Sequence, residues 1–216
     1  MIIEPSHFEY LSVQRGEVSD HRHDFEQWKK AYLGSLREIA ESIWPVLPAT
    51  CERVLDVGSG LGGIDLLLSR RFKTARFDLL DGTDYKPYVY NHNIPFSNAD
   101  VALDFHKKNG NERVECVWPK VPEDRKYDLV VSFAAFCFHI APINYLAGIC
   151  RASHPQTRVI LEVRRDRKDW LKQLVEQFGK PIVLAKREKF VRLGFRCETS
   201  SSSQADGASG STTPTT

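Results

Sequence analysis

The sequence predicts an α/β fold in which parallel strands alternate with helices. Short apolar runs, each about the length of a strand, alternate with amphipathic segments between residues 53 and 178. The first of these runs, residues 53–57, leads into a glycine-rich turn and then into an apolar segment at helical spacing. Two last runs, residues 182–185 and 189–196, are joined by a polar turn and predict a closing hairpin.

Composition argues against several classes of partner. The chain has 216 residues, enough for one domain with a substantial core. Its 30 basic and 28 acidic residues give a net charge of +2, which offers no electrostatic footprint for nucleic acid or an anionic membrane. No apolar run approaches the roughly 18 residues of a membrane span, and the first residues lack a secretory signal. Five cysteines without a C-x-x-C pair are expected to be reduced, so we expect a cytoplasmic protein without a metal site.

The N-terminal part predicts one long helix. Residues 1–19 show no clear pattern and are expected to be irregular, whereas apolar residues recur at steps of three and four over residues 24–44. Pro45 ends this helix, which we expect to cover one edge or face of the domain. The histidines at positions 21 and 23 are too close in sequence to share one helix face, so they indicate a solvated helix start rather than a metal site.

The glycine-rich turn is the strongest functional signal. Small residues at 58, 60 and 62 let backbone approach a ligand, and the start of a helix offers unpaired N–H groups. Gly58, Gly60 and Gly63 also satisfy the dinucleotide fingerprint G-x-G-x-x-G, which is weak alone. Asp56 favours a different ligand, because a carboxylate at the strand tip repels a diphosphate and attracts a cationic amino group and a sulfonium.

The segment Asp56-Val57-Gly58-Ser59-Gly60-Leu61-Gly62 resembles motif I (D/E-x-G-x-G-x-G) of the class I S-adenosylmethionine-dependent methyltransferases. The resemblance covers residues 50–198. It implies a Rossmann-like, doubly wound, mostly parallel seven-stranded sheet that ends in an antiparallel hairpin, and S-adenosylmethionine as the cofactor. Residues 1–49 would then form an N-terminal helical cap, and residues 199–216, rich in Ser, Thr, Gly and Ala, a disordered tail. The implied contacts to the cofactor come from Gly58, Ser59, Gly60, Gly62 and, at its amino group, Asp56.

The second strand, within residues 74–81, ends in a candidate for the ribose. Asp81 lies 23 residues after Gly58, near the spacing at which a carboxylate accepts both ribose hydroxyls, and the resembling family carries an acid at this strand tip. Asp84 is the alternative, and a simple turn aspartate is another. The aromatic loop over residues 85–96 is a candidate wall for adenosine or substrate. Trp118 would stack on adenine or pack locally.

The fourth strand, residues 126–132, continues into a segment that corresponds to motif IV of the family. Ser132 would lie beneath the methionine part of the cofactor. The tetrapeptide that starts at Ser132 is Ser-Phe-Ala-Ala, not the N/D-P-P-Y type, which argues against N-methylation of DNA bases. His139 is a candidate general base or substrate contact, or a hydrogen-bonded histidine at the start of a helix.

The remaining segments complete the alternation. Residues 142–153 predict a helix, residues 157–163 a strand and residues 167–178 a further helix. Glu162 of this strand and the charged cluster over residues 164–168 would bind an anionic substrate, or the cluster would form a solvated face.

The sequence thus predicts an S-adenosylmethionine-dependent methyltransferase that acts on an oxygen, nitrogen or carbon of a small-molecule acceptor. A methyltransferase acting on RNA or protein is one alternative. A nicotinamide-dependent oxidoreductase or an inactive ligand-binding module is the other. Nothing in the sequence indicates the acceptor or an oligomeric state.

Overall fold

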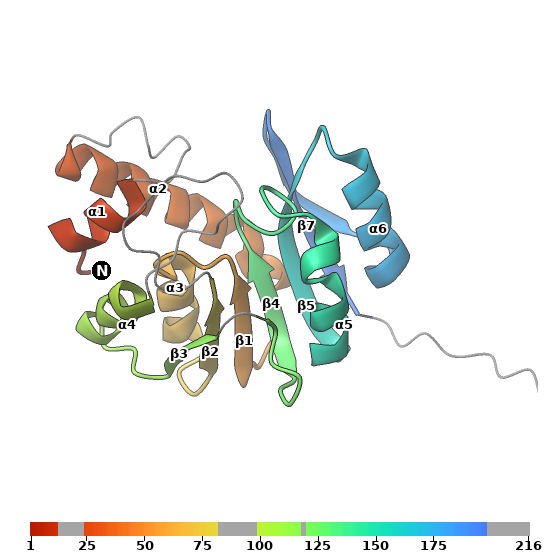
Figure 1. Ribbon diagram of the computed structural model, residues 1–216, viewed down its shortest axis with the longest axis horizontal. Helices are drawn as coiled ribbons and strands as arrows, with labels where there is room; N and C mark the ends of the chain where they lie inside the picture. The colour runs from red at the N-terminus through yellow and green to blue at the C-terminus, as the bar shows by residue number, and fades with distance from the viewer. Residues whose placement is uncertain (13–23, 82–98, 118–119, 198–216) are drawn as a thin grey trace, which may run out of the picture.

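The computed structural model describes residues 1–12, 24–81, 99–117 and 120–197 (Figure 1). The predictions for Asp84, for Trp118, for the histidines at 21 and 23, for the loop 85–96 and for the tail lie outside these residues.

Seven strands of the described chain form one sheet in the order β3-β2-β1-β4-β5-β7-β6. The strands are β1 (Arg53–Val57), β2 (Arg76–Leu80), β3 (Val114–Val117), β4 (Tyr127–Ser132), β5 (Ser153–Arg164), β6 (Ile182–Lys186) and β7 (Phe190–Arg196). The first five run parallel, and β7 is antiparallel to both of its neighbours. The predicted mostly parallel seven-stranded sheet with a closing antiparallel hairpin is therefore confirmed.

Helices cover both faces of the sheet (Figure 1). They are α1 (Pro5–Ser12), α2 (Phe25–Ile43), α3 (Gly63–Arg71), α4 (Ala99–Lys108), α5 (Leu146–Ala152) and α6 (Lys168–Phe178), with short 3₁₀ turns at Trp44–Val46 and Pro142–Asn144. On β4, Leu129 and Val131 face the core under α2 and α3, whereas Val130 faces the core under α5 and α6. Successive strand residues point to opposite faces, so this one strand supplies both cores. None of the described helices has the length and apolar character of a membrane span.

The long N-terminal helix follows its prediction closely. The Asp24 carboxylate caps α2 by accepting from the N–H groups of Glu26 and Gln27 at 3.0 and 3.1 Å. Leu36 and Ile43 on α2 lie in the same core as strands β1, β2 and β4. The helical segment therefore shares the core of the sheet, and its separation as a cap over residues 1–49 stays a prediction.

The structure corrects three expectations about local structure. Residues Pro5–Ser12 form the helix α1 rather than irregular chain. The helix predicted over residues 142–153 is a 3₁₀ turn followed by α5, because Tyr145 leaves the helical region at φ −129° and ψ −17°. The fifth strand also begins earlier than expected, at Ser153.

Candidate active site

The turn between β1 and α3 depends on glycine. Gly58, Gly60 and Gly62 have φ values of 77°, 55° and 69°, in the left-handed region that side chains rarely adopt. The Gly58 N–H donates to the Leu80 carbonyl at 2.6 Å, which ties the turn to the end of β2. The sequence therefore builds a turn whose backbone, rather than its side chains, faces the carboxyl ends of the strands.

Three other elements close around this turn. A Cβ atom on Gly58 would lie 2.0 Å from the Ala135 Cβ in the loop after β4. On Gly62 it would lie 2.4 Å from the His106 Nε2 of α4, and on Gly63 it would lie 2.2 Å from the Tyr32 hydroxyl of α2. These glycines thus permit close approach as well as unusual dihedral angles.

Two buried carboxyl groups lie beneath the turn. Asp56 is 3% exposed and Asp65, in the first turn of α3, is fully buried. Apart from their contact with each other and with the Asp65 N–H, one oxygen of Asp56 and both oxygens of Asp65 find no hydrogen-bond partner in the described structure. Burial, and then the like charge of Asp65, raises the pKa of Asp56 well above its usual range, while burial raises the pKa of Asp65 to about 7. The two carboxyls interact directly, and burial disfavours the ionised form of each.

Neutral groups from two helices surround this pair. Tyr32 stacks on Trp28 with ring centroids 5.2 Å apart, and burial followed by the charges of Asp56 and Asp65 raises its pKa. His106 is buried on α4, and its Nδ1 accepts from the Asn111 side-chain amide at 3.0 Å. Burial lowers the pKa of His106 to about 4, so its ring is uncharged at neutral pH.

Asp81 adjoins the same turn. It follows β2 directly, and its Oδ2 accepts from the Gly60 N–H at 2.6 Å. Burial, and then the negative charge of Asp81, raises the pKa of Tyr145, the residue that precedes α5. The structure therefore brings together Asp56, Asp81 and the predicted glycines, while their roles toward a cofactor stay predictions.

Ser132 has two partners within the protein. Its hydroxyl donates to the Val57 carbonyl at 2.6 Å and accepts from the Phe136 N–H at 3.0 Å. These bonds hold the end of β4 against the end of β1. In the loop that follows, Ala134 and Cys137 have φ values of 54° and 64°, an uncommon conformation for residues with side chains.

His139 lies on the exposed rim of that loop. Its N–H donates to the Ala135 carbonyl at 2.7 Å, and its ring meets Phe138 edge-on at 4.8 Å. Partial burial, and then the positive charge of Arg164, lowers its pKa, so the ring is neutral at physiological pH. The Arg164 N–H donates to the Cys137 carbonyl at 3.1 Å, which joins the loop to the end of β5.

A buried ion network holds α2 to the sheet, and the sequence analysis missed it. Arg192 of β7 is 1% exposed and contacts Glu162 of β5 at 2.5 Å. It also donates to Ser42 at 2.6 Å and reaches Glu38 at 3.2 Å, both on α2. Glu162 in turn accepts from the Ala134 N–H at 2.9 Å. The available sequence signal was an arginine between apolar residues of a strand.

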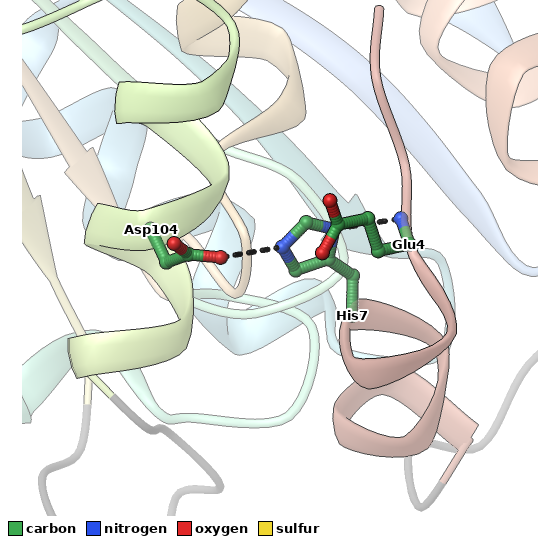
Figure 2. A group of neighbouring side chains, drawn as sticks. All are labelled: Glu4, His7 and Asp104. Atoms are coloured by element: carbon green, nitrogen blue, oxygen red, sulfur yellow. Dashed lines mark hydrogen bonds and ion pairs between the residues drawn. The ribbon is translucent and has the colours of Figure 1, made fainter.

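A second charged group, at the N-terminus, resembles a metal site. Ligand atoms of Glu4, His7 and Asp104 lie within 4.8 Å of one another (Figure 2). The His7 Nδ1 accepts from the Glu4 N–H at 3.0 Å, so its Nε2 carries the proton and faces Asp104 at 3.4 Å. The Lys108 ammonium lies 2.6 Å from Glu4 and 2.8 Å from Asp104 and supplies the positive charge. The cluster is therefore satisfied as a clamp between α1 and α4.

Two cavities in the described part of the chain lie away from the turn. One, of about 480 Å³, opens at the amino ends of the parallel strands and is lined by Glu52, Arg53, Thr74, Arg76, Lys126, Asp128 and His154. The other, of about 600 Å³, lies along α2 and α3 beside Met1. Neither is lined by a predicted site residue.

No family model matches the chain, and no curated protein matches its sequence. Solved structures do match it. The ribosomal protein L11 methylase of Lactobacillus delbrueckii subsp. bulgaricus superposes with a TM-score of 0.56 at 13% identity, over 74% of this chain and 77% of that one. The precorrin-6y C5,15-methyltransferase of Geobacter metallireducens GS-15 gives 0.52 at 14% identity, over 74% and 87% of the two chains. The protein LaPhzM gives 0.54 at 17% identity, over 88% of this chain and 61% of that one.

At sequence identities of 13–17%, these superpositions establish a shared fold and nothing beyond it. The glycine-rich turn after β1, the strand order and the antiparallel β7 all agree with the resemblance stated from the sequence. The chain has the fold of the class I S-adenosylmethionine-dependent methyltransferases.

Proposed function

We propose that this protein is an S-adenosylmethionine-dependent methyltransferase that acts on a small-molecule acceptor. The observation that carries the proposal is the buried Asp56 carboxyl with a partnerless oxygen, set against a glycine turn at the carboxyl ends of parallel strands. Open α/β sheets bind their ligands at this edge. A carboxylate there suits a cationic amino group and opposes a diphosphate, so the site fits this cofactor better than a dinucleotide.

The glycine turn and the ends of β1 and β2 would each bind a different part of the cofactor. The backbone of Gly58, Ser59 and Gly60 would pack against its methionine part, Asp56 would pair with its amino group, and Asp81 would bind its ribose. The Gly60 N–H already orients the Asp81 carboxylate at 2.6 Å. When bound, the cofactor supplies a methyl group activated by the sulfonium.

The protein's own contribution is mainly alignment. An acceptor oxygen, nitrogen or carbon must approach in line with the methyl group, and fixed geometry removes much of the entropic barrier. A base is needed only where the acceptor must lose a proton. His139 is the candidate, since its lowered pKa keeps the ring neutral and ready to accept a proton.

Calorimetric titration tests this proposal. S-adenosylmethionine and S-adenosylhomocysteine should bind in the micromolar range, and NAD should not bind. Asp81→Asn should weaken binding roughly tenfold or more through the loss of charge-assisted hydrogen bonds to ribose. Asp124→Asn is the matched control, because the Asp124 side chain is 84% exposed. The proposal fails if neither adenosyl ligand binds the wild-type protein, or if NAD binds more tightly.

RNA is the second candidate acceptor, and one surface favours it. Residues 164–169 and 186–189 hold seven basic and three acidic residues, a local charge of +4 in a chain of net charge +2. We call these ten residues the basic rim. Arg164 pairs with Phe190 in the sheet, and the Arg165 N–H donates to the Lys189 carbonyl at 3.1 Å. The basic rim thus lies at the carboxyl end of β5, the same end of the sheet as the glycine turn.

Salt dependence separates the two acceptors. An RNA acceptor predicts that binding of a structured oligonucleotide weakens steeply between 50 and 200 mM salt. The double variant Arg165→Glu and Lys189→Glu should then flatten this dependence, whereas the exposed pair Lys120→Glu and Lys172→Glu should leave it unchanged. A small-molecule acceptor predicts weak oligonucleotide binding in the wild-type protein at physiological salt.

A further inference from the structure

We propose that Asp65 is a positioning residue for the cofactor's amino group. In the absence of cofactor it shares one proton with Asp56, and this proton passes to solvent when the cationic amino group pairs with Asp56. The inference rests on the proposed function and adds a residue outside motif I to the site.

Partnerless polar atoms gather around one turn. Buried polar groups in native proteins are nearly always hydrogen-bonded, so a group of exceptions requires an explanation. The buried carboxyl oxygens Asp56 Oδ1, Asp65 Oδ1 and Asp65 Oδ2 have no partner in the described structure other than one another and the Asp65 N–H, and the buried Ser59 Oγ has none. Their gathering at the glycine turn points to a polar ligand rather than to scattered packing faults.

The Asp65 side chain lies close to the glycine turn. It lies in the first turn of α3, and its Oδ2 would be 3.2 Å from a Cβ atom on Gly62. Only a glycine at 62 leaves that space open. The side chain is fully buried, so it does not serve as a solvated helix-cap charge, although its helix position would suit one.

No described cation compensates the pair. The titratable groups that face Asp65 are Asp56 from β1 and Tyr32 from α2, with His106 of α4 against the neighbouring Gly62. Tyr32 and His106 are both uncharged at neutral pH. Two carboxylates in so apolar a site do not both ionise without a counter-charge, so one proton remains between them. An arriving ammonium group replaces that proton with a positive charge of its own.

The pair also makes stability depend on pH, with a definite sign. Because the folded-state pKa of Asp65 is raised from 3.8 to about 7, the stability that its protonated form contributes is full below about pH 4. That contribution is lost as pH rises through about 7. Asp65→Asn keeps the shape and removes the buried charge, so it should raise the melting temperature of the cofactor-free protein at pH 8 by about 3–6 °C.

Binding of S-adenosylhomocysteine, measured by calorimetry from pH 6 to pH 7.5, tests the proposal. The wild-type affinity should rise close to tenfold more than that of Asp65→Asn over this range, because binding to the wild type expels an additional proton, held with a pKa of about 7. At pH 6, titrations in two buffers of different ionisation enthalpy should show that the wild type releases nearly one proton more than Asp65→Asn. The variant keeps a smaller dependence on pH, because burial also raises the pKa of Asp56. The ligand's own amino group titrates alike with both proteins and cancels in the comparison.

The outcomes separate this inference from the proposed function. If wild-type protein binds the ligand but releases no proton at pH 6, the shared proton does not exist and the inference is overturned. Equal pH profiles for wild type and Asp65→Asn would overturn it as well. If the wild-type protein binds neither adenosyl ligand, the proposed function itself has failed. The wild-type proton measurement needs no variant, so poor folding of Asp65→Asn would not prevent a decision.

Discussion

Replacing Arg192 with methionine should lower the free energy of unfolding by about 3–5 kcal/mol. The variant leaves the Glu162 carboxylate, 5% exposed, in the protein interior without the cation that lies 2.5 Å away in the wild type. It also removes the bond from Arg192 to Ser42, so α2 loses an anchor to the sheet. Chemical denaturation followed by far-ultraviolet circular dichroism measures the loss directly.

Two controls identify the cause of that loss. The double variant Arg192→Met and Glu162→Gln removes both charges, and it should recover much of the stability because no buried ion is left unpaired. Arg187→Met breaks a contact to Glu38 at 2.7 Å, but Arg187 is half exposed, so we expect a change of less than about 1 kcal/mol. If Arg192→Met alone proved as stable as the wild type, the ion network would not contribute to the stability of the fold.

Asp78→Asn should lower the melting temperature by about 5–10 °C. Asp78 is 1% exposed and accepts from the Tyr127 hydroxyl at 2.7 Å, and it lies 3.0 Å from both Arg53 and Arg125. An amide cannot balance two guanidinium groups. The side chains of Arg53 and Arg125 are each 23% exposed, so solvent screening limits the loss of unfolding free energy to about 2–3 kcal/mol.

Thermal unfolding of Asp78→Asn beside Asp124→Asn isolates this effect. Asp124 lies 4.0 Å from the same Arg125 but is 84% exposed, so its replacement should shift the melting temperature by about 1 °C at most. Equal shifts in the two variants would show that the buried pairing of Asp78 adds nothing. The contrast with Asp65 is physical: the same substitution destabilises where a buried carboxylate has cations and stabilises where it has none.

Local patterns predicted most of the fold. The apolar runs at Arg53–Val57 and Tyr127–Ser132 became central parallel strands, because strands buried on both faces read as continuous apolar segments. Asp24 and the helical periodicity after it gave α2 almost to the residue. The carboxylate at Asp56 favours S-adenosylmethionine over a dinucleotide at the glycine turn from the sequence alone, and its role toward a cofactor stays a prediction.

Features that depend on distant contacts were not predictable in this way. The helix α1 is only eight residues long, and isolated helices of that length are unstable, so it forms on α4 rather than by its own propensity. The roles of Tyr32 and His106 around the turn also arise from tertiary packing. The sequence does contain a signal for Asp65, because it is an acidic residue between Ile64 and Leu66 in an otherwise apolar segment. An acidic residue inside an apolar helical segment therefore indicates a candidate site residue.

The clamp between α1 and α4 has a consequence for the order in which the chain is assembled. The Ile2 N–H donates to the Asn109 side chain at 2.6 Å, and the Ile2 carbonyl accepts from the same side chain at 2.8 Å. Glu4 and His7 find their partners on α4 as well. During synthesis residues 2–7 are therefore made roughly a hundred residues before their docking surface on α4 exists, and closing so long a loop is slow. We expect the contacts between α1 and α4 to be among the last to form.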